Sequence, residues 1–243
     1  MKSKFFNSPV ITPTLTGAAM HAAFVEGDLL FDWTSFEIPR GVARLIGATT
    51  IIRPKGDAAP THQPAGIDLV FAKDTAVSAT PATLGTLNSP AILTPRHDII
   101  GSLPSVDSDI IGGGTAVIST TKSPGIVLTP EPNSGGNVGV DKYWVAGIAA
   151  GNIDFSSILV VADADIASAA HTTINTGGTS MDNREHFIAG DVIHAQDGAV
   201  VGTLTSVAES AITLTAELGT SVLTNGDTLY CINPIKLTLH FSK

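Results

Sequence analysis

The stretch FDWTSFEIPRGVARLIGATTIIRP (residues 31–54), followed after a polar segment by GIDLVFAK (residues 66–73), carries the strongest structural signal in the chain. The central Pro39-Arg40-Gly41 is a turn sequence, because proline fixes one backbone angle and glycine adopts angles that other residues avoid. Residues 42–52 are almost all small or branched and apolar, which predicts a buried central strand. Residues 67–71 are apolar at every second position, which predicts a second strand beside the first.

The composition of the whole chain indicates an all-β protein. The chain has 243 residues, which is enough to bury a core in two modest domains. Only 5% of the residues are aromatic and 14% are charged, while 24 are glycine and 14 are proline. This composition is typical of many short strands joined by turns, since helices are usually rich in Glu and Lys.

The strand pattern predicts two β domains. Between Gly27 and Asp163 it predicts about eight strands, which fits a jelly-roll-like β-sandwich. Residues 187–241 predict about five strands, the size of a small β-barrel. The expected parts are an extended N-terminal arm that contacts neighbouring molecules rather than its own core, the sandwich, a linker and the barrel, at residues 1–18, 19–165, 166–185 and 186–243.

Charge and hydropathy argue against several classes of partner. The formal net charge is −9 and the chain has no basic run, so we expect no direct binding of nucleic acid. No segment reaches the about 18 consecutive apolar residues of a membrane helix, and no signal peptide is recognised in residues 1–9. The single Cys231 cannot form an internal disulfide, which is compatible with cytoplasmic synthesis.

The histidines offer one candidate metal cluster. His186 and His194, together with Asp191, come closest to converging, and no helical pair of histidines is present. A structural zinc site typically needs four nitrogen or sulfur ligands, and the chain has one cysteine. We therefore interpret the histidines as surface or hairpin residues and predict no metal ligands.

Two pairs of acids and one glycine run also resemble known sites. Asp107 with Asp109, and Asp163 with Asp165, have the alternating spacing of calcium loops but lack the glycine and the distal glutamate. They are interpreted as solvated loop acids. The run Gly112-Gly113-Gly114 is followed by neither Lys-Ser/Thr nor a helix, so it is interpreted as a turn and not as a phosphate loop.

No catalytic constellation is recognised. The chain has no G-x-S-x-G motif, and Cys231 has no histidine near it in sequence. With two Trp and two Tyr, the aromatic residues that sugar-processing enzymes often display are scarce. The sequence therefore predicts a protein that is not an enzyme, with no catalytic, cofactor-binding or metal-binding residues and no cofactor.

Short phrases at both ends of the chain resemble a known class of protein. They are GDLLFDWTSFEIPRGVARLIGAT (27–49) with IDLVFAK (67–73), and then FIAGDVIHA (187–195), GAVVGTLTSV (198–207), ITLT (212–215) and NGDTLY (225–230). These phrases resemble virion structural proteins of tailed bacteriophages, especially the small β-rich proteins that decorate or cement the capsid. The resemblance covers most of residues 27–241 and contains no catalytic motif, so it transfers no functional residue.

The resemblance implies a non-enzymatic protein on the capsid surface of the virion. Such proteins bind the outer face of the shell in many copies, so the implied partners are the major capsid protein and further copies of the chain, with a trimer favoured. One alternative is a tail, baseplate or fibre protein with a receptor-binding role. Another is a cellular enzyme or sugar-binding module, which the missing site and scarce aromatic residues disfavour.

Overall fold

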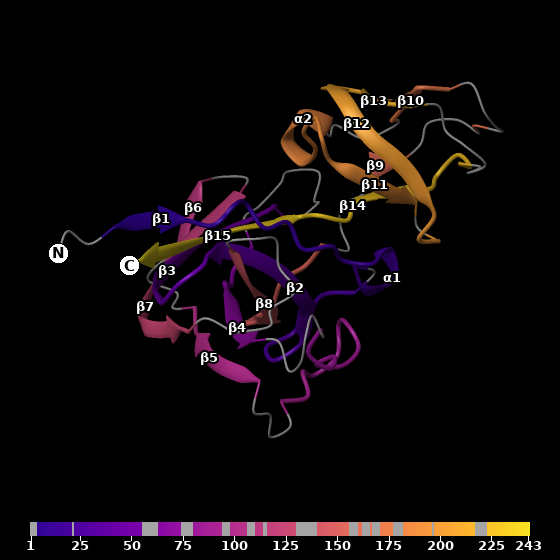
Figure 1. Ribbon diagram of the computed structural model, residues 1–243. Helices are drawn as coiled ribbons and strands as arrows, with labels where there is room; N and C mark the ends of the chain where they lie inside the picture. The colour runs from indigo at the N-terminus through magenta and orange to yellow at the C-terminus, as the bar shows by residue number, and fades with distance from the viewer. Residues whose placement is uncertain are drawn as a thin grey trace.

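The computed structural model is an all-β protein, as the composition predicts. In the part of the chain that it describes, fifteen strands form three antiparallel sheets, and two four-residue helices, α1 (Gly17–Met20) and α2 (Asn183–His186), lie between strands (Figure 1). The residues described are 4–20, 22–54, 63–73, 80–93, 98–105, 110–113, 116–129, 140–155, 160–161, 166, 171–176, 182–195, 197–216 and 223–243.

The first sheet has five strands and combines the two ends of the chain with its middle. Its strands, in spatial order, are β1 (Phe5–Asn7), β15 (Ile235–Ser242), β3 (Ala43–Ile52), β7 (Ala116–Leu128) and β6 (Ile110–Gly113). The expected central strand at residues 42–52 is confirmed as β3, which has β15 on one side and β7 on the other. The expectation of a buried strand holds for one face only, because Arg44 and Ile51 on the other face are exposed.

The second sheet has four strands and faces the first. Its strands, in spatial order, are β2 (Leu29–Pro39), β8 (Val140–Ala149), β4 (Ile67–Lys73) and β5 (Ile99–Leu103). The expectation that the strand at residues 67–71 lies beside β3 is wrong, since β4 pairs with β8 and β5. Its alternation correctly indicates an element with a buried face, but it does not identify the neighbouring strand.

Aromatic and aliphatic side chains fill the space between these two sheets. Phe36 of β2 stacks on Phe241 of β15, with ring centroids 6.3 Å apart. At the other side, a methyl group on Gly101 of β5 would lie only 3.0 Å from the Ile126 side chain of β7. The five- and four-stranded sheets therefore share one tightly packed core, which gives this body the layering of a β-sandwich.

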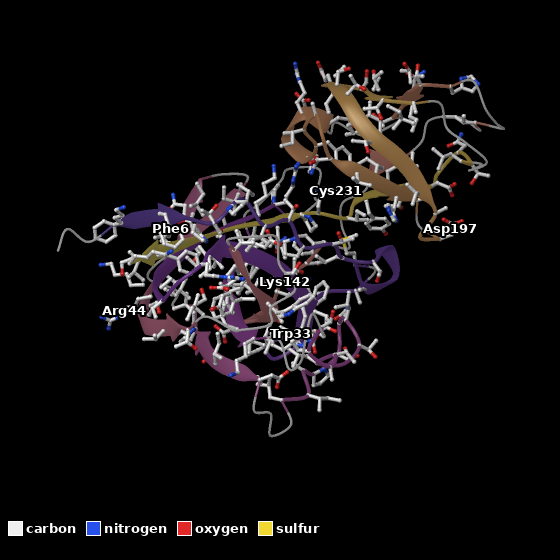
Figure 2. The ribbon with its side chains drawn as sticks, in the orientation of Figure 1. Phe6, Trp33, Arg44, Lys142, Asp197 and Cys231 are labelled. Carbon is white, nitrogen blue, oxygen red and sulfur yellow. The ribbon has the colours of Figure 1, made fainter. Side chains whose placement is uncertain are left out.

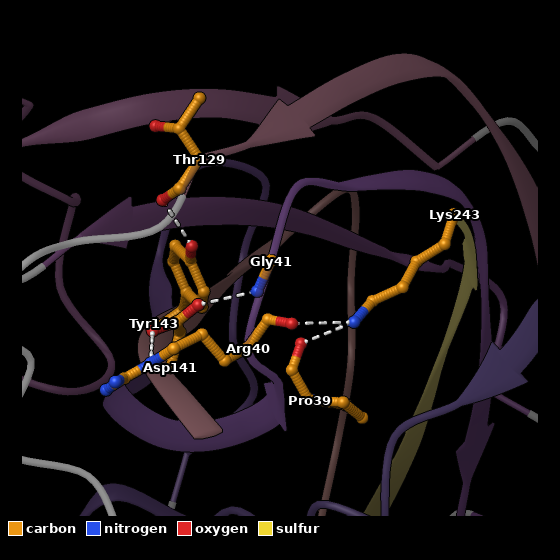
Figure 3. Close-up of polar contacts among 7 residues, drawn as sticks. All are labelled: Pro39, Arg40, Gly41, Thr129, Asp141, Tyr143 and Lys243. Carbon is orange, nitrogen blue, oxygen red and sulfur yellow. Dashed lines mark hydrogen bonds and ion pairs between the residues drawn. The ribbon is translucent and has the colours of Figure 1, made fainter. Parts of the chain in front are cut away.

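The predicted turn at Pro39-Arg40-Gly41 is confirmed and joins the two sheets. Gly41 has φ of 126°, a value that favours glycine. The fully buried carboxylate of Asp141 accepts hydrogen bonds from the Gly41 N–H at 3.2 Å and from Arg40 Nε at 3.3 Å (Figure 3). Lys243 Nζ donates to the carbonyl oxygens of Pro39 and Arg40, so the C-terminal residue also holds the turn.

The third sheet has six strands and stands apart from the other two in Figure 1. Its strands, in spatial order, are β10 (Thr173–Asn175), β13 (Ala211–Leu214), β12 (Val200–Ala208), β11 (Val192–Ala195), β14 (Thr228–Cys231) and β9 (Val160–Val161). Within the described residues β10 and β9 do not pair with each other, so the sheet is open and the expected closed barrel is not found. The expected linker at residues 166–185 contains β10 and α2, so its described part is not a simple connection.

The last strand, β15, does not belong to the six-stranded sheet. All five strands predicted within residues 187–241 form, but β15 runs on from β14 into the five-stranded sheet and pairs with β3 from Ile235 to Ser242 (Figure 1). It therefore does not belong to a separate unit at residues 186–243. The reason is its alternation of fully buried apolar residues, which covers the sandwich core.

The N-terminal segment packs on its own chain. The Ser8 N–H donates to Leu239, Ile11 forms a two-way bridge with Leu237, and the Leu15 N–H donates to Ile232. Leu15 is fully buried and Ile11 is 6% exposed. For residues 4–16 the expectation of an arm that contacts neighbours rather than its own core is therefore wrong, because every second side chain from Ile11 to Leu15 points into the sandwich.

Candidate functional site

The three residues proposed above as the nearest approach to a metal cluster form no such cluster. His186 and Asp191 are each 1% exposed, so the expected surface position is wrong for His186. Asp191 accepts from Arg53 Nη2 at 2.6 Å and from the Ile188 N–H at 2.8 Å. His194 Nδ1 lies 3.0 Å from the carbonyl oxygen of Gly198. Among the described residues, no group of three or more His, Cys, Asp or Glu side chains is arranged to hold a metal ion.

The Arg53 guanidinium links the sandwich to the six-stranded sheet. It follows β3 and reaches Asp191 just before β11, and its Nη1 donates to the carbonyl oxygen of His186 at 2.6 Å. Burial is the larger effect on Asp191 and raises the pKa of its carboxyl group, while the Arg53 charge opposes that shift. This contact fixes how α2 and β11 meet the end of β3.

The other sequence candidates show no assembled site. The acids at 107, 109, 163 and 165 lie outside the described residues, as does Gly114, while Gly112 and Gly113 belong to β6. Cys231 is fully buried in β14, and its Sγ donates to Asn233 Oδ1 at 3.1 Å. Burial raises the pKa of this thiol to about 12, so it is a structural and not a reactive cysteine.

The outer face of the five-stranded sheet is the most distinctive surface of the described chain. We call this surface the outer face; it consists of the side chains on β1, β15, β3 and β7 that point away from the sandwich core. Several of its side chains are apolar and exposed, namely Ile51 at 40%, Ile118 at 44%, Val127 at 54% and Phe5 at 72%. Ile51 lies directly opposite Ile118 in the β3–β7 register, so these two form a continuous apolar pair.

The charges of this sheet have one sign. Its five strands contain no Asp or Glu, and they contribute Arg44, Lys122 and Lys236 to the outer face. In contrast, the strands of the four-stranded sheet carry four acids and two lysines, and those of the six-stranded sheet carry no charged residue. In a chain of net charge −9, the outer face is therefore locally cationic.

A row of hydroxyl and imidazole groups crosses the middle of the outer face. His240 of β15 contacts Thr49 Oγ1 at 2.8 Å through Nε2 and Asn7 Oδ1 at 2.9 Å through Nδ1. Thr49 in turn lies 3.4 Å from Thr120 of β7, oxygen to oxygen. These contacts tie the side chains of four strands together, which favours a flat, ordered surface.

One end of the outer face leads into an apolar hollow beside the six-stranded sheet. The hollow has a volume of about 320 Å³, and Ile188, which is 46% exposed, forms its far side. Its other lining residues come from the ends of β3, β7 and β15 and are Ile51, Arg53, Pro54, Ala116, Pro234 and Lys236. The apolar part of the outer face therefore continues as far as the Arg53–Asp191 link.

Comparison with known proteins identifies no family for this chain. The chain matches no protein-family model, and neither the curated proteins nor the solved structures contain a match. No helix in the described part of the chain has the length and hydropathy required to cross a membrane.

Sequence reasoning missed the outer face, although a signal for it exists. The acid-free segments are visible in the sequence at residues 43–52, 116–128 and 235–242. They become one surface only when the strand order places them side by side. That order depends on pairings between segments far apart in the chain, which the period of each strand does not specify.

Proposed function

We propose that this chain is a non-enzymatic structural protein of a virion, which decorates or cements the capsid shell and docks on it through the outer face. The observation that carries the proposal is the charge of that face, which is cationic and free of acids in an acidic protein. Such a face suits an acidic, partly apolar protein surface, because complementary charge guides docking and apolar contact stabilises it.

The exposed apolar residues of the outer face support a protein partner. Exposed aliphatic residues that are contiguous across β3 and β7 are typical of interaction sites, whereas isolated ones are common on any surface. In line with the resemblance described above, the proposed partner is the major capsid protein. The chain would then be synthesised in the host cytoplasm and reside on the capsid surface, as a homo-oligomer for which a trimer is favoured.

We also propose that the sandwich is of the jelly-roll type. In a jelly roll a long two-stranded ribbon folds over, so that its successive strand pairs lie in alternate sheets. Here β2 pairs with β8 in one sheet, and β3 pairs with β7 in the other. β4 then pairs with both β8 and β5, which extends the same order. Two sheets that face each other and exchange successive strands are the features of jelly rolls that support this assignment.

Quantitative mass spectrometry of purified particles tests the location of the chain. We expect a copy number comparable to that of the major shell subunit. A copy number far below that of the shell subunit would favour the tail, baseplate or fibre alternative. Absence from purified particles would contradict a virion role altogether.

A charge reversal tests the docking face. Lys122→Glu places an acid at an exposed position of the face, and the matched control Thr205→Glu/Ala208→Glu changes the net charge equally at exposed positions of β12. At low salt we expect Lys122→Glu to weaken binding to undecorated capsids by about tenfold, whereas the control binds within about twofold of the unmodified protein. Equal effects of both variants would show that net charge, and not this face, governs binding.

A further inference from the structure

A second surface of the sandwich has a different character. Two adjoining hollows, each of about 460 Å³, share Thr12, Thr34 and Ser35 and so form one groove. We call it the edge groove. One wall is β2 from Asp32 to Glu37, and the other wall is the N-terminal segment from Pro9 to Thr14. Gly85, Leu87, Lys142 and Trp144 complete the lining. The groove lies between two extended stretches of backbone.

The β2 wall is the edge of a sheet. Among the described strands β2 pairs only with β8. Residues 88–89 hydrogen-bond to Leu29 at the start of its other side, so the edge without a neighbouring strand is the part of β2 that follows. In an antiparallel strand the main-chain N–H and C=O groups of alternate residues point to opposite sides. No hydrogen bond joins the main chain of Thr34, Ser35 or Phe36 to a described segment other than β8. Alternate main-chain groups of this stretch therefore point into the groove.

The opposite wall also presents main-chain groups. Ile11 uses both its N–H and its C=O in the bridge to Leu237 of β15, at 2.8 Å each. In an extended chain the groups of the adjacent residues point the other way, so Val10 and Thr12 direct theirs away from β15, to the side on which the groove lies. Both walls therefore offer hydrogen-bonding groups at the repeat of a β-strand.

We propose that the edge groove binds an extended segment of a partner polypeptide, which adds to β2 as a further strand. Rows of main-chain donors and acceptors along two extended walls match the main chain of another strand, which is the basis of recognition by strand addition. Six residues of β2, from Asp32 to Glu37, would accommodate a segment of about 20 Å. This inference does not depend on the proposed docking of the outer face.

The side chains of the groove indicate which segment fits. Thr12, Thr14, Thr34 and Ser35 line it with hydroxyl groups, and Asp32 and Glu37 add two carboxylates against the single ammonium group of Lys142. Lys142 Nζ lies 4.4 Å from the ring centre of Trp144, so the indole ring already holds this cation. Figure 2 shows Trp33 and Lys142 in the sandwich, apart from the six-stranded sheet. The groove therefore favours a segment with small side chains and a basic residue.

The same charges argue against a second copy of the chain as the occupant. Pairing β2 with β2 of another molecule would bring Asp32 and Glu37 from both copies into one groove. Four carboxylates would then face two Lys142 side chains. Like charges on neighbouring strands are destabilising, so we expect the occupant to come from a different protein.

The test uses the full chain and defined peptides. The probe is the capped hexapeptide Thr-Val-Lys-Val-Thr-Val, compared with the same peptide carrying Glu in place of Lys, and with two forms N-methylated at alternate amides. Amide resonances of the labelled protein report binding. We expect shifts at Thr34, Ser35 and Phe36, and slowed hydrogen exchange at those of the three whose N–H points away from β8. We expect the Lys peptide to bind about tenfold more tightly than the Glu peptide, which corresponds to one charge interaction. At least one N-methylated form should lose about tenfold, because methylation removes strand hydrogen bonds.

Two variants connect these effects to the groove. Ser35→Lys places a positive charge at an exposed position of β2 and should abolish binding of the Lys peptide, whereas Thr120→Lys, an equivalent change on β7, should not. Glu37→Gln should reduce the preference for Lys over Glu while leaving the thermal midpoint close to that of the unmodified protein. No amide shift at about 2 mM peptide would overturn the proposal. Equal binding of every N-methylated form, or protection of these amides by self-association, would do so as well.

Discussion

Asp141 is a carboxylate with no exposed surface at the point where the two sheets of the sandwich connect. Its two oxygens accept from the Gly41 main chain and the Arg40 side chain. Arg40 is 55% exposed, so this ion pair contributes little by itself. The main-chain hydrogen bond is worth more, because without Asp141 the Gly41 N–H loses a charged acceptor.

We therefore expect Asp141→Ala to lower the free energy of unfolding by about 2–3 kcal/mol. The matched variant is Tyr143→Phe, which removes one hydrogen bond from the same strand, that of the Tyr143 hydroxyl to the Thr129 carbonyl oxygen at 2.6 Å (Figure 3). It should cost about 1 kcal/mol. Urea unfolding of the three proteins measures both values. A loss for Asp141→Ala no larger than that for Tyr143→Phe would contradict the role assigned to the carboxylate.

Asp191 makes the stability of the protein depend on pH in a definite direction. Burial raises the pKa of its carboxyl group above the ordinary value of 3.8, against the opposing Arg53 charge. The folded state then binds this proton more tightly than the unfolded state. The contribution of Asp191 is therefore largest below pH 3.8 and decreases as the pH rises through the folded-state pKa.

Comparison with Asp191→Asn isolates this effect from the other carboxylates. The unfolding free energy of the unmodified protein minus that of the variant should fall as the pH rises from about 3 to about 7. Urea unfolding at a series of pH values measures this difference. A difference that increases with pH would mean that the Arg53 charge outweighs burial.

At the scale of elements, the N-terminal segment behaves as part of the sandwich. Leu15 is fully buried, and its N–H donates to Ile232 at 2.7 Å. Leu15→Ala should lower the free energy of unfolding by about 2–5 kcal/mol, because it leaves a cavity in the core. The neighbouring exposed Thr14 provides the control, and Thr14→Ala should stay within about 0.5 kcal/mol of the unmodified protein. If the two variants had similar free energies of unfolding in chemical denaturation, the N-terminal segment would not be part of the sandwich core.

The sequence predicts which segments become strands better than it predicts which strands are neighbours. The turn at Pro39-Arg40-Gly41 and the alternation of β15 follow from local chemistry, and both are present. The errors concern partners, since β4 and β15 each lie beside strands other than those expected. A period of two indicates which face is buried, but many strands offer equivalent faces, and long-range packing selects among them.

The edge groove and the outer face could not be predicted from the sequence for the same reason. The edge groove has walls from residues 9–14 and 32–37, which become opposite only because the N-terminal segment follows β15. The outer face likewise needs the order of its strands. The composition shows that charged residues are few, but it cannot show that the strands of one sheet carry three cations and no acid.

At the scale of the whole molecule, Cys231 reports on the six-stranded sheet. Its side chain is fully buried, and its thiol pKa is raised to about 12, so alkylation requires the sheet to open. We expect iodoacetamide to label the native protein at least about 1,000-fold more slowly than the urea-unfolded protein, because β14 continues directly into the sandwich as β15. Labelling within about tenfold of the unfolded rate would mean that the six-stranded sheet opens independently at little cost.

The position of β15 also has a consequence for synthesis on the ribosome. β3 is complete after residue 52, but the strand that covers one of its edges begins only at residue 235. Until then the growing chain carries β3 with an unpaired edge, a feature that promotes aggregation. The sandwich therefore reaches its final pairing only after nearly all of these 243 residues have been translated. Products that stop before β15 are expected to require chaperones or to be degraded, because β3 then keeps an unpaired edge.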